Sequence, residues 1–240
     1  MRVEWAQPFP PLRPHTTYQE LKTHERYDAA KRHGDADQAV ELCYELCDEN
    51  LMWWLDQNFR GRHPAPIVIA PSLPPAETNN ALARTYAAWL ADQLDAEYCP
   101  DILQTNAAVK RDLITETYDR LVQEQLYEGP VQAGRDYILV DDVCTSGGTL
   151  ASLHGFVRQG EGRVVCVTAL ANRYGQPTLL AIEPKTLAEA IAAFDGQLPD
   201  LVIEELGYEI ACLTETEARY LLNRASVDAI RKGLATARSA

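Results

Sequence analysis

The sequence has few basic residues, no long apolar run and no apolar leader. Lys and Arg number 22 against 35 Asp and Glu, which gives a formal net charge of −13. A chain this acidic repels a nucleic-acid backbone unless it carries a local basic patch, and the sequence shows none, so we expect no nucleic-acid partner. No stretch approaches the ~20 apolar residues of a membrane span, and the N-terminus lacks the apolar core of a signal peptide. We therefore expect a cytoplasmic protein that does not bind membranes.

Closely paired cysteines are also missing. The six cysteines form no C-x-x-C pair, and Cys43 and Cys47 stand four apart on one face of an expected helix. Structural zinc sites use closely spaced cysteine pairs, so zinc is not expected. Because the residues around the cysteines are apolar, we expect free and mostly buried thiols.

Apolar residues, in contrast, are plentiful. Hydrophobic residues make up 46% of the 240 positions, which is ample for a core. The order of predicted elements divides the chain into a helical N-terminal extension over residues 1–64, an α/β core over 65–172 and a helical C-terminal extension over 173–240.

The N-terminal extension combines a Pro-rich start with two helical patterns. Residues 1–16 lack periodicity, which predicts an arm laid over the surface. The patterns that follow predict one helix over Tyr18–Arg32 and a second from about residue 35 or 37 to 55. Trp53 and Trp54 could stack on a base, but paired aromatics at the end of an amphipathic helix favour the core.

Strand and helix patterns alternate through the core and then give way to helices. Strands are predicted over residues 67–70, 97–103, 137–140 and 163–170, with helices over 79–94 and 149–159. A strand, helix and strand in so few residues indicate a parallel crossover. The C-terminal extension predicts helices over residues 187–194, 200–206, 218–223 and 226–238, the third opened by a capping box at Thr214 and Glu217.

Residues 137–150 carry the clearest chemical signal. Tyr137 to Val140 form an apolar run suited to a strand buried on both faces, and two acids, Asp141 and Asp142, follow it. Buried carboxylates are costly unless paired or bound, so we expect the acids at the carboxyl edge of the sheet, placed for ribose hydroxyls or a divalent cation. The turn Thr145–Thr149 has three hydroxyls and two glycines before a helix, an arrangement that suits a phosphate. The alternative is a Gly-rich hairpin whose acids are simply solvated.

This segment resembles the 5-phosphoribosyl 1-pyrophosphate (PRPP) binding motif of type I phosphoribosyltransferases: four apolar residues, two acids, two variable residues, then Thr and small residues. The resemblance covers roughly residues 65–172. It implies an α/β fold with a doubly wound parallel sheet, here with helical N- and C-terminal extensions.

The resemblance also implies roles for individual residues. Asp141 and Asp142 would hold the ribose 2′ and 3′ hydroxyls and Mg²⁺. The residues implied to bind the 5′-phosphate are those of the turn, Thr145, Ser146, Gly147, Gly148 and Thr149. Cys144 lies inside this ligand loop at a position where the family has an apolar residue, so we include it with a packing role.

The segment after the first core strand departs from the family. By position it is the pyrophosphate loop, which in the family often carries a basic residue, yet no Lys or Arg occurs between Ile67 and Leu82. Pyrophosphate would therefore meet mainly backbone amides, with Ser72, Thr78 and Asn79 as helpers.

A second loop supplies two adjacent cations, Lys110 and Arg111. In type I enzymes a mobile loop in this place closes over the site and presents basic residues to pyrophosphate, so the resemblance makes this pair catalytic candidates. The alternative is an ordinary solvated charge pair. The stretch from Lys110 through Arg120 to Tyr127 also looks like that of the competence-associated phosphoribosyltransferase-like proteins.

Two functional hypotheses follow. The first is a phosphoribosyltransferase that uses PRPP and Mg²⁺ to transfer phosphoribose to a small nitrogenous acceptor, as a possible homodimer. The second is a non-catalytic PRPP- or nucleotide-sensing regulator or assembly scaffold with the same fold, which the cation-free loop at 71–78 favours. The acceptor cannot be named from the sequence, and Tyr174 is equally suited to stacking on a base and to packing.

Overall fold

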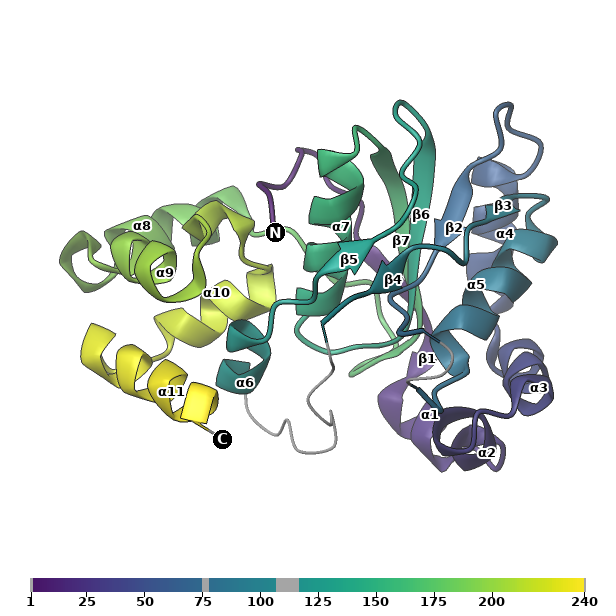
Figure 1. The fold of residues 1–240 in the computed structure, drawn as a ribbon, viewed down its shortest axis with the longest axis horizontal. Helices are drawn as coiled ribbons and strands as arrows, with labels where there is room; N and C mark the ends of the chain where they lie inside the picture. Colours follow the sequence, from purple (N-terminus) through teal and green to yellow (C-terminus); the bar gives the residue numbers. More distant parts are fainter. Residues whose placement is uncertain (1, 75–77, 107–116, 240) are drawn as a thin grey trace.

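A computed structural model of the chain describes residues 2–74, 78–106 and 117–239. Its centre is an all-parallel, five-stranded sheet in the order β1-β7-β6-β2-β3 (Figure 1). The strands of this sheet are β1 (Leu12–Thr17), β2 (Ile67–Ile69), β3 (Glu97–Tyr98), β6 (Asp136–Cys144) and β7 (Arg163–Asn172). A separate antiparallel pair joins β4 (Leu103–Gln104) to β5 (Tyr127–Glu128).

Helices cover both faces of the sheet, so the predicted doubly wound α/β architecture is confirmed. The helices of the N-terminal half are α1 (Tyr18–Thr23), α2 (Tyr27–Arg32), α3 (Ala36–Leu46), α4 (Glu49–Phe59) and α5 (Leu82–Gln93). Those that follow are α6 (Thr117–Val122), α7 (Gly148–Gln159), α8 (Pro184–Gly196), α9 (Leu198–Leu206), the 3₁₀ helix η3 (Ile210–Cys212), α10 (Glu215–Leu222) and α11 (Val227–Ser239).

Alternation along the central strands explains why both faces are covered. Ile67 and Ile69 of β2 pack into the core on the α7 side, whereas Val68 packs into the core that α3, α4 and α5 share. In β6, Leu139 packs into the same core as Ile67 and Ile69, and Ile138 packs into the same core as Val68. Successive side chains of a strand point to opposite faces, so an uninterrupted apolar run requires a cover on each side.

The predicted surface arm is wrong for the first residues of the chain. Residues 12–17 form β1, an edge strand of the main sheet that pairs with β7. Upstream of it, Arg2 and Trp5 are also buried. Pro14 lies within β1, where its missing N–H is tolerated because the strand lies at the edge of the sheet.

A buried chain of hydrogen bonds fixes β1 in place. The amide of Asp48 donates to Nδ1 of His15 (3.0 Å), so Nε2 of that ring carries the proton and donates to the hydroxyl of Tyr86 (2.9 Å). Tyr86 bonds to Thr168 (2.9 Å), and Thr168 donates to the carbonyl of Arg13 (2.6 Å). These hydrogen bonds join β1 to α5 and β7. His15 is neutral at physiological pH, because burial lowers its pKa to about 4.

Both predicted N-terminal helices are broken in two. The first divides into α1 and α2, and a capping box between Thr17 and Glu20 opens α1. The second divides into α3 and α4 at Asp48, whose carboxylate caps α4 by accepting from the amide of Leu51 (2.7 Å). The core position predicted for Trp53 is wrong, since it is 67% exposed, and Trp54 is half-buried against the guanidinium of Arg13 at 4.2 Å.

Two predicted core elements are also shorter than expected. The predicted strand over residues 97–103 is divided between β3 and β4, which belong to different sheets. The helix predicted from residue 79 begins at Leu82, because the side chain of Asn80 accepts from the amide of Leu82 (3.1 Å) ahead of the first turn.

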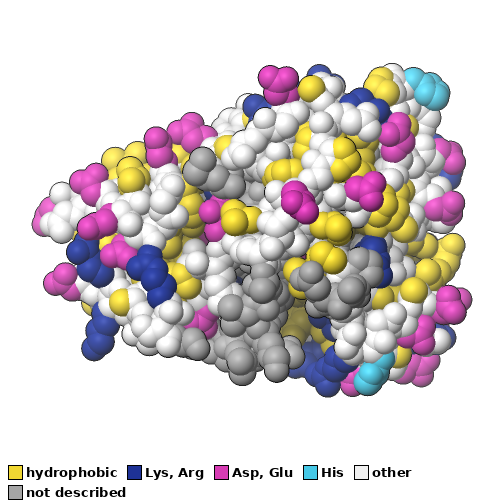
Figure 2. All heavy atoms as spheres, viewed as in Figure 1, with side chains coloured by type: hydrophobic (Ala, Val, Ile, Leu, Met, Phe, Trp, Pro, Cys, Tyr) yellow, Lys and Arg dark blue, Asp and Glu magenta, His cyan; other side chains and the backbone are white. Residues whose placement is uncertain are grey.

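The C-terminal helices stand beside α7 and α6 (Figure 1). The predicted capping box is confirmed, since Thr214 accepts from the amide of Glu217 and Glu217 accepts from that of Thr214. Acidic side chains are spread over the visible face of the molecule, with basic side chains in small groups (Figure 2). No helix within residues 2–74, 78–106 or 117–239 combines the length and apolar composition that a bilayer crossing requires.

Candidate functional site

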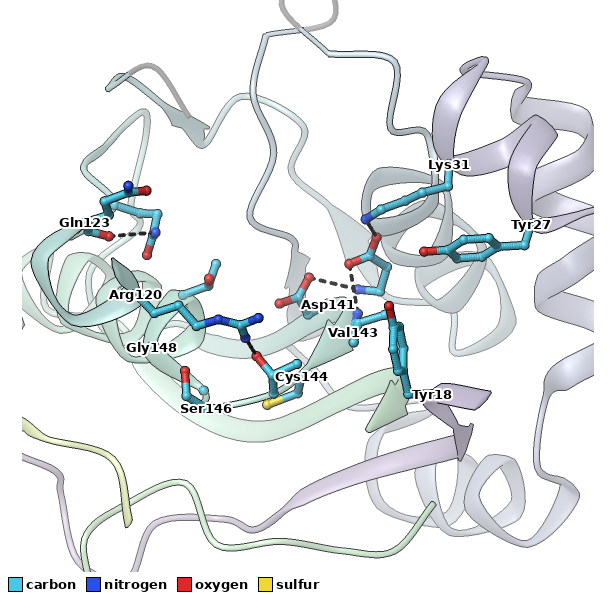
Figure 3. A pocket seen from close by; sticks show the side chains of 15 residues that line it. Tyr18, Tyr27, Lys31, Arg120, Gln123, Asp141, Val143, Cys144, Ser146 and Gly148 are labelled. Atoms are coloured by element: carbon cyan, nitrogen blue, oxygen red, sulfur yellow. Dashed lines mark hydrogen bonds and ion pairs between the residues drawn. The ribbon is translucent and has the colours of Figure 1, made fainter. Parts of the chain in front are cut away.

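A cavity of about 280 Å³ lies at the carboxyl end of β6 (Figure 3). Three separate parts of the chain line it. One wall is the end of β6 and the turn after it, residues 141–149. The others are formed by Tyr18, Tyr27 and Lys31 of α1 and α2, and by Arg120, Gln123 and Gln125 of α6 and the segment after it.

The turn between β6 and α7 leads into the cavity wall through two glycines whose places no other residue could take. Gly147 has φ +83°, a left-handed conformation, and a Cβ there would lie 2.5 Å from Cδ2 of Leu180. Only glycine satisfies both conditions. The next residue, Gly148, begins α7, and no described side chain caps the first turn of that helix. Its first amides and the positive end of its dipole therefore remain available to a ligand in the cavity.

The back of this turn is held by α10 with its N-cap and by Arg2, near the start of the described chain. The hydroxyl of Thr214 donates to the carbonyl of Ser146 (2.7 Å). Behind Gly148 lies a buried, bidentate ion pair in which Arg2 donates to Glu217 through Nη1 (2.6 Å) and Nη2 (2.9 Å). A Cβ on Gly148 would lie 2.7 Å from both partners. These contacts leave no room for the turn to move away from the cavity.

The two acids lie within β6 and are almost completely buried, with 5% of Asp141 and 3% of Asp142 exposed. Asp141 accepts from the amide of Asp142 (2.8 Å), and Oδ1 of Asp142 accepts from the amide of Val143 (2.8 Å). Oδ2 of Asp142 accepts from the side-chain amide of Asn80 (3.0 Å) and forms an ion pair with Lys31. The strand thus extends past the acids, but the acids still line the cavity at its carboxyl end.

Cations reach the site from two sides. Lys31 extends from α2 to Asp142, and Arg120 extends from α6 to the hydroxyl of Thr145 (Figure 3). The phenol of Tyr27 lies beside the acid pair, and burial, followed by the charge of Asp142, raises its pKa to about 12. Tyr27 is therefore a neutral hydroxyl at physiological pH. The cavity has a basic group at the turn, acids in the middle and a basic group beyond them.

Cys144 lines the same cavity, but its surroundings make its thiol a poor nucleophile. Burial, followed by the negative charge of Asp141, raises the pKa of its thiol well above the usual value. All six cysteines are free, and four of them are buried, as the sequence predicts. The thiol of Cys144 is therefore protonated at neutral pH and packs under the turn.

The structure brings together most of the predicted site residues. The acid pair, Cys144 and all five residues of the turn line one cavity. Ser72 does not line it, because the chain there turns toward β4 and the carbonyl of Ser72 accepts from the amide of Gln104 (2.8 Å). Lys110 and Arg111 lie outside the described residues, so their catalytic role stays a prediction.

The acid pair alone makes an incomplete metal site. Within the described residues, no group of three or more His, Cys, Asp or Glu side chains is placed to hold a metal ion. Mg²⁺, however, is commonly bound by one or two carboxylates together with oxygens of a phosphorylated substrate. Asp141 and Asp142 fit that second mode, in which the metal arrives with the ligand.

Sequence reasoning missed Lys31, Tyr27 and Asn80. Lys31 and Asp142 are 111 positions apart, and α2 has no local pattern that separates a site lysine from an ordinary surface lysine. Asn80 falls at the start of the helix predicted over residues 79–94, just after the predicted pyrophosphate loop at 71–78, and no local pattern distinguishes it from an ordinary helical residue.

Comparison with known proteins gives relatives much longer than this chain. No family model matches the sequence. Protein TraN of Escherichia coli is 33% identical over 239 residues, which cover 99% of this chain and 52% of TraN. An uncharacterized protein of Haemophilus influenzae is 27% identical over 157 residues, covering 65% of this chain and 34% of that protein. The chain thus spans about half the length of the first relative and about a third of the second.

Solved structures of phosphoribosyltransferases resemble part of the chain. Adenine phosphoribosyltransferase from Leishmania donovani has a TM-score of 0.36 and 15% identity, covering 68% of this chain and 64% of that one. A hypoxanthine phosphoribosyltransferase from Staphylococcus aureus has a TM-score of 0.34 and 14% identity, covering 57% of this chain and 73% of that one.

Proposed function

We propose that the protein is a phosphoribosyltransferase that binds PRPP together with Mg²⁺ and transfers phosphoribose to a small nitrogenous acceptor. The observation that carries this proposal is the shared cavity of the acid pair and the uncapped start of α7. An anion site and a pair of hydrogen-bond acceptors at the end of one strand suit a sugar phosphate, whose diol donates to carboxylates while its phosphate accepts from amides.

In this proposal each part of the cavity has a defined task. The amides that begin α7, with Arg120, hold the 5′-phosphate. Asp141 and Asp142 accept hydrogen bonds from the ribose 2′ and 3′ hydroxyls and thereby orient C1′. Mg²⁺, when bound, neutralises charge on the pyrophosphate oxygens. The braced turn keeps the sugar phosphate fixed while the reacting atoms move.

The reaction exchanges one bond at C1′ for another. The bond from C1′ to the pyrophosphate oxygen breaks, and pyrophosphate leaves with its electron pair. A lone pair on the acceptor nitrogen forms the new bond to C1′, and the proton of that nitrogen passes to the departing pyrophosphate or to solvent water. The protein's main contribution is electrostatic, because it positions charge around a sugar that becomes positive and a leaving group that becomes negative.

A second candidate function is a PRPP- or nucleotide-sensing regulator or assembly scaffold that keeps the ligand site without catalysis. The absence of Lys and Arg between Ile67 and Leu82 favours it, since the usual cation for the leaving group is missing there. The ion pair between Lys31 and Asp142 favours it too, because one acid of the pair is already neutralised.

Calorimetry and a turnover assay separate these functions. PRPP with Mg²⁺ is titrated into the protein, and pyrophosphate release is then measured with a panel of purine, pyrimidine and other nitrogenous acceptors. The enzyme hypothesis expects binding and release with at least one acceptor. Binding without release across the panel would favour the regulator, and no binding would refute the sugar-phosphate site.

A matched pair of variants tests the site itself. Replacing Asp141 and Asp142 together by Asn should lower PRPP affinity at least tenfold, because hydrogen bonds to charged groups are lost. The control is Asp136→Asn at the opposite end of β6, where the carboxylate pairs with Arg163 (2.7 Å) on the surface. The control should bind PRPP as the parent protein does. Equal affinity in all three proteins would contradict the assignment.

A further inference from the structure

Residues 79–81, at the end of the segment that precedes α5, lie against helix α2 and the turn after it. The amide of Ala81 donates to the carbonyl of Ala30 (3.1 Å), and a Cβ on Gly34 would lie 3.3 Å from the carbonyl oxygen of Asn79. The end of this cation-free segment is therefore packed on the turn of chain that carries Lys31. The neighbouring helix α2 can therefore provide the positive charge that this segment lacks.

Lys31 reaches the site at the place where this segment meets the acids. Its ammonium and the amide of Asn80, which belongs to the segment, both contact Oδ2 of Asp142. The Lys31 side chain is 25% exposed, whereas that of Asp142 is 4% exposed. Lys31 thus covers the acid on one side and lines the open cavity on the other.

The ammonium has capacity beyond this ion pair. A lysine ammonium carries three N–H donors, and Asp142 is the ionic partner that the described residues show for it. The other donors can serve an anion in the cavity while the contact with Asp142 persists. With Arg120 at the turn, the site then has one cation for each end of a ligand that is anionic at both ends and hydroxylated in the middle.

We propose that Lys31 binds the pyrophosphate group of PRPP and stabilises the charge that builds on it as it leaves. This inference rests on the proposed function of the cavity and assigns one half of the ligand to α2. A residue outside the predicted α/β core thereby completes the site, and the helical N-terminal segment becomes part of the ligand-binding machinery.

Two ligands that differ only at the anomeric position separate this role from a structural one. PRPP and ribose 5-phosphate, each with Mg²⁺, are titrated calorimetrically into the parent protein and into Lys31→Met. We expect affinity for PRPP to fall roughly tenfold to hundredfold, because charge-assisted hydrogen bonds to pyrophosphate are lost. Affinity for ribose 5-phosphate should stay within about threefold of the parent value, since that ligand has no pyrophosphate.

Companion variants control for charge and folding. Arg32→Met removes one positive charge from the same helix at an exposed position, where Arg32 pairs with Asp28 (3.5 Å), and should change neither affinity. Lys31→Arg keeps the charge and should retain most of the PRPP affinity. Lys31→Gln keeps a hydrogen-bond donor for Asp142, so it replaces Lys31→Met if that variant does not fold.

The outcomes distinguish the inference from the function on which it rests. An equal loss for both ligands would show that Lys31 only holds Asp142, and no loss for either would show that it does not reach the ligand; both overturn the inference. Equal binding of PRPP and ribose 5-phosphate by the parent protein would overturn it while keeping the sugar-phosphate site. Failure of the parent protein to bind either ligand would refute the proposed function itself.

Discussion

Breaking the buried ion pair behind the turn between β6 and α7 should cost a large part of the stability of the protein. In the variant Arg2→Met, the Glu217 carboxylate loses both guanidinium hydrogen bonds and keeps its bond from the amide of Thr214 (3.0 Å). The two side chains are 1% and 0% exposed, so water cannot replace the lost partner. Removing one partner of such a pair costs about 3 to 5 kcal/mol. That is a large fraction of the roughly 5 to 15 kcal/mol that stabilises a typical domain.

The assay is equilibrium unfolding in urea, followed by tryptophan fluorescence and circular dichroism. The control is Arg231→Met, which breaks an ion pair of similar length to Glu204 (2.7 Å) whose side chains are 49% and 63% exposed. It also removes a longer contact to Glu205 (3.7 Å), which keeps its ion pair with Arg238 (2.5 Å). Because solvent screens the pair with Glu204, its loss should cost about 0.5 kcal/mol or less. The two variants therefore compare ion pairs that differ chiefly in burial.

A double-mutant cycle isolates the interaction from other effects. Glu217→Gln keeps an oxygen for the capping box while removing the charge, and alone it should also cost about 3 kcal/mol or more, because it strands the buried guanidinium of Arg2. The combination of both changes should cost clearly less than their sum. A loss below about 1 kcal/mol for Arg2→Met, or strictly additive losses, would refute the reasoning.

Three further predictions concern pH, the turn and the thiol in the cavity. Burial lowers the pKa of His15 and of His154 from 6.5 to about 4, so the unfolded chain binds more protons between these values. The free energy of unfolding should have its full value above pH 6.5 and should fall by about 3 kcal/mol per histidine as the pH is lowered toward 4. Urea titrations at several pH values measure this change. Gly147→Ala should lose both stability and phosphate affinity, whereas Gly134→Ala, with φ +73° and nothing within 4 Å, should lose only about 1 kcal/mol of stability and no affinity. The thiol of Cys144 should react with iodoacetamide more slowly than the half-buried thiols, measured by mass spectrometry at pH 7.5; rapid labelling would contradict its raised pKa.

The site could be predicted from the sequence where its signal is contiguous. Asp141, Asp142 and the turn that ends at Thr149 follow one another, so a single strand and turn bring them together. Lys31 and Arg120 reach the same cavity through the packing of helices far away in the sequence. No local sequence pattern indicates such a contact, because a cation that lines the cavity and a solvated surface cation both occur in ordinary helical sequence.

The fold shows the same division between local and tertiary signals. The apolar strands β2 and β6 and the capping box at Thr214 can be predicted because they depend on neighbouring residues. β1 was missed because Pro14 is typical of loops, and only pairing with β7 shows that an edge strand tolerates it. The break between α1 and α2 lacks Gly and Pro, so nothing local marked it.

The ion pair between Arg2 and Glu217 also bears on how the protein is made. The two residues are 215 positions apart, so the guanidinium of Arg2 leaves the ribosome well before the carboxylate of Glu217. The ion pair behind the turn between β6 and α7 therefore cannot form until α10 has been synthesised. A nascent chain that already has β6 and α7 should therefore acquire ligand binding only when synthesis has passed α10.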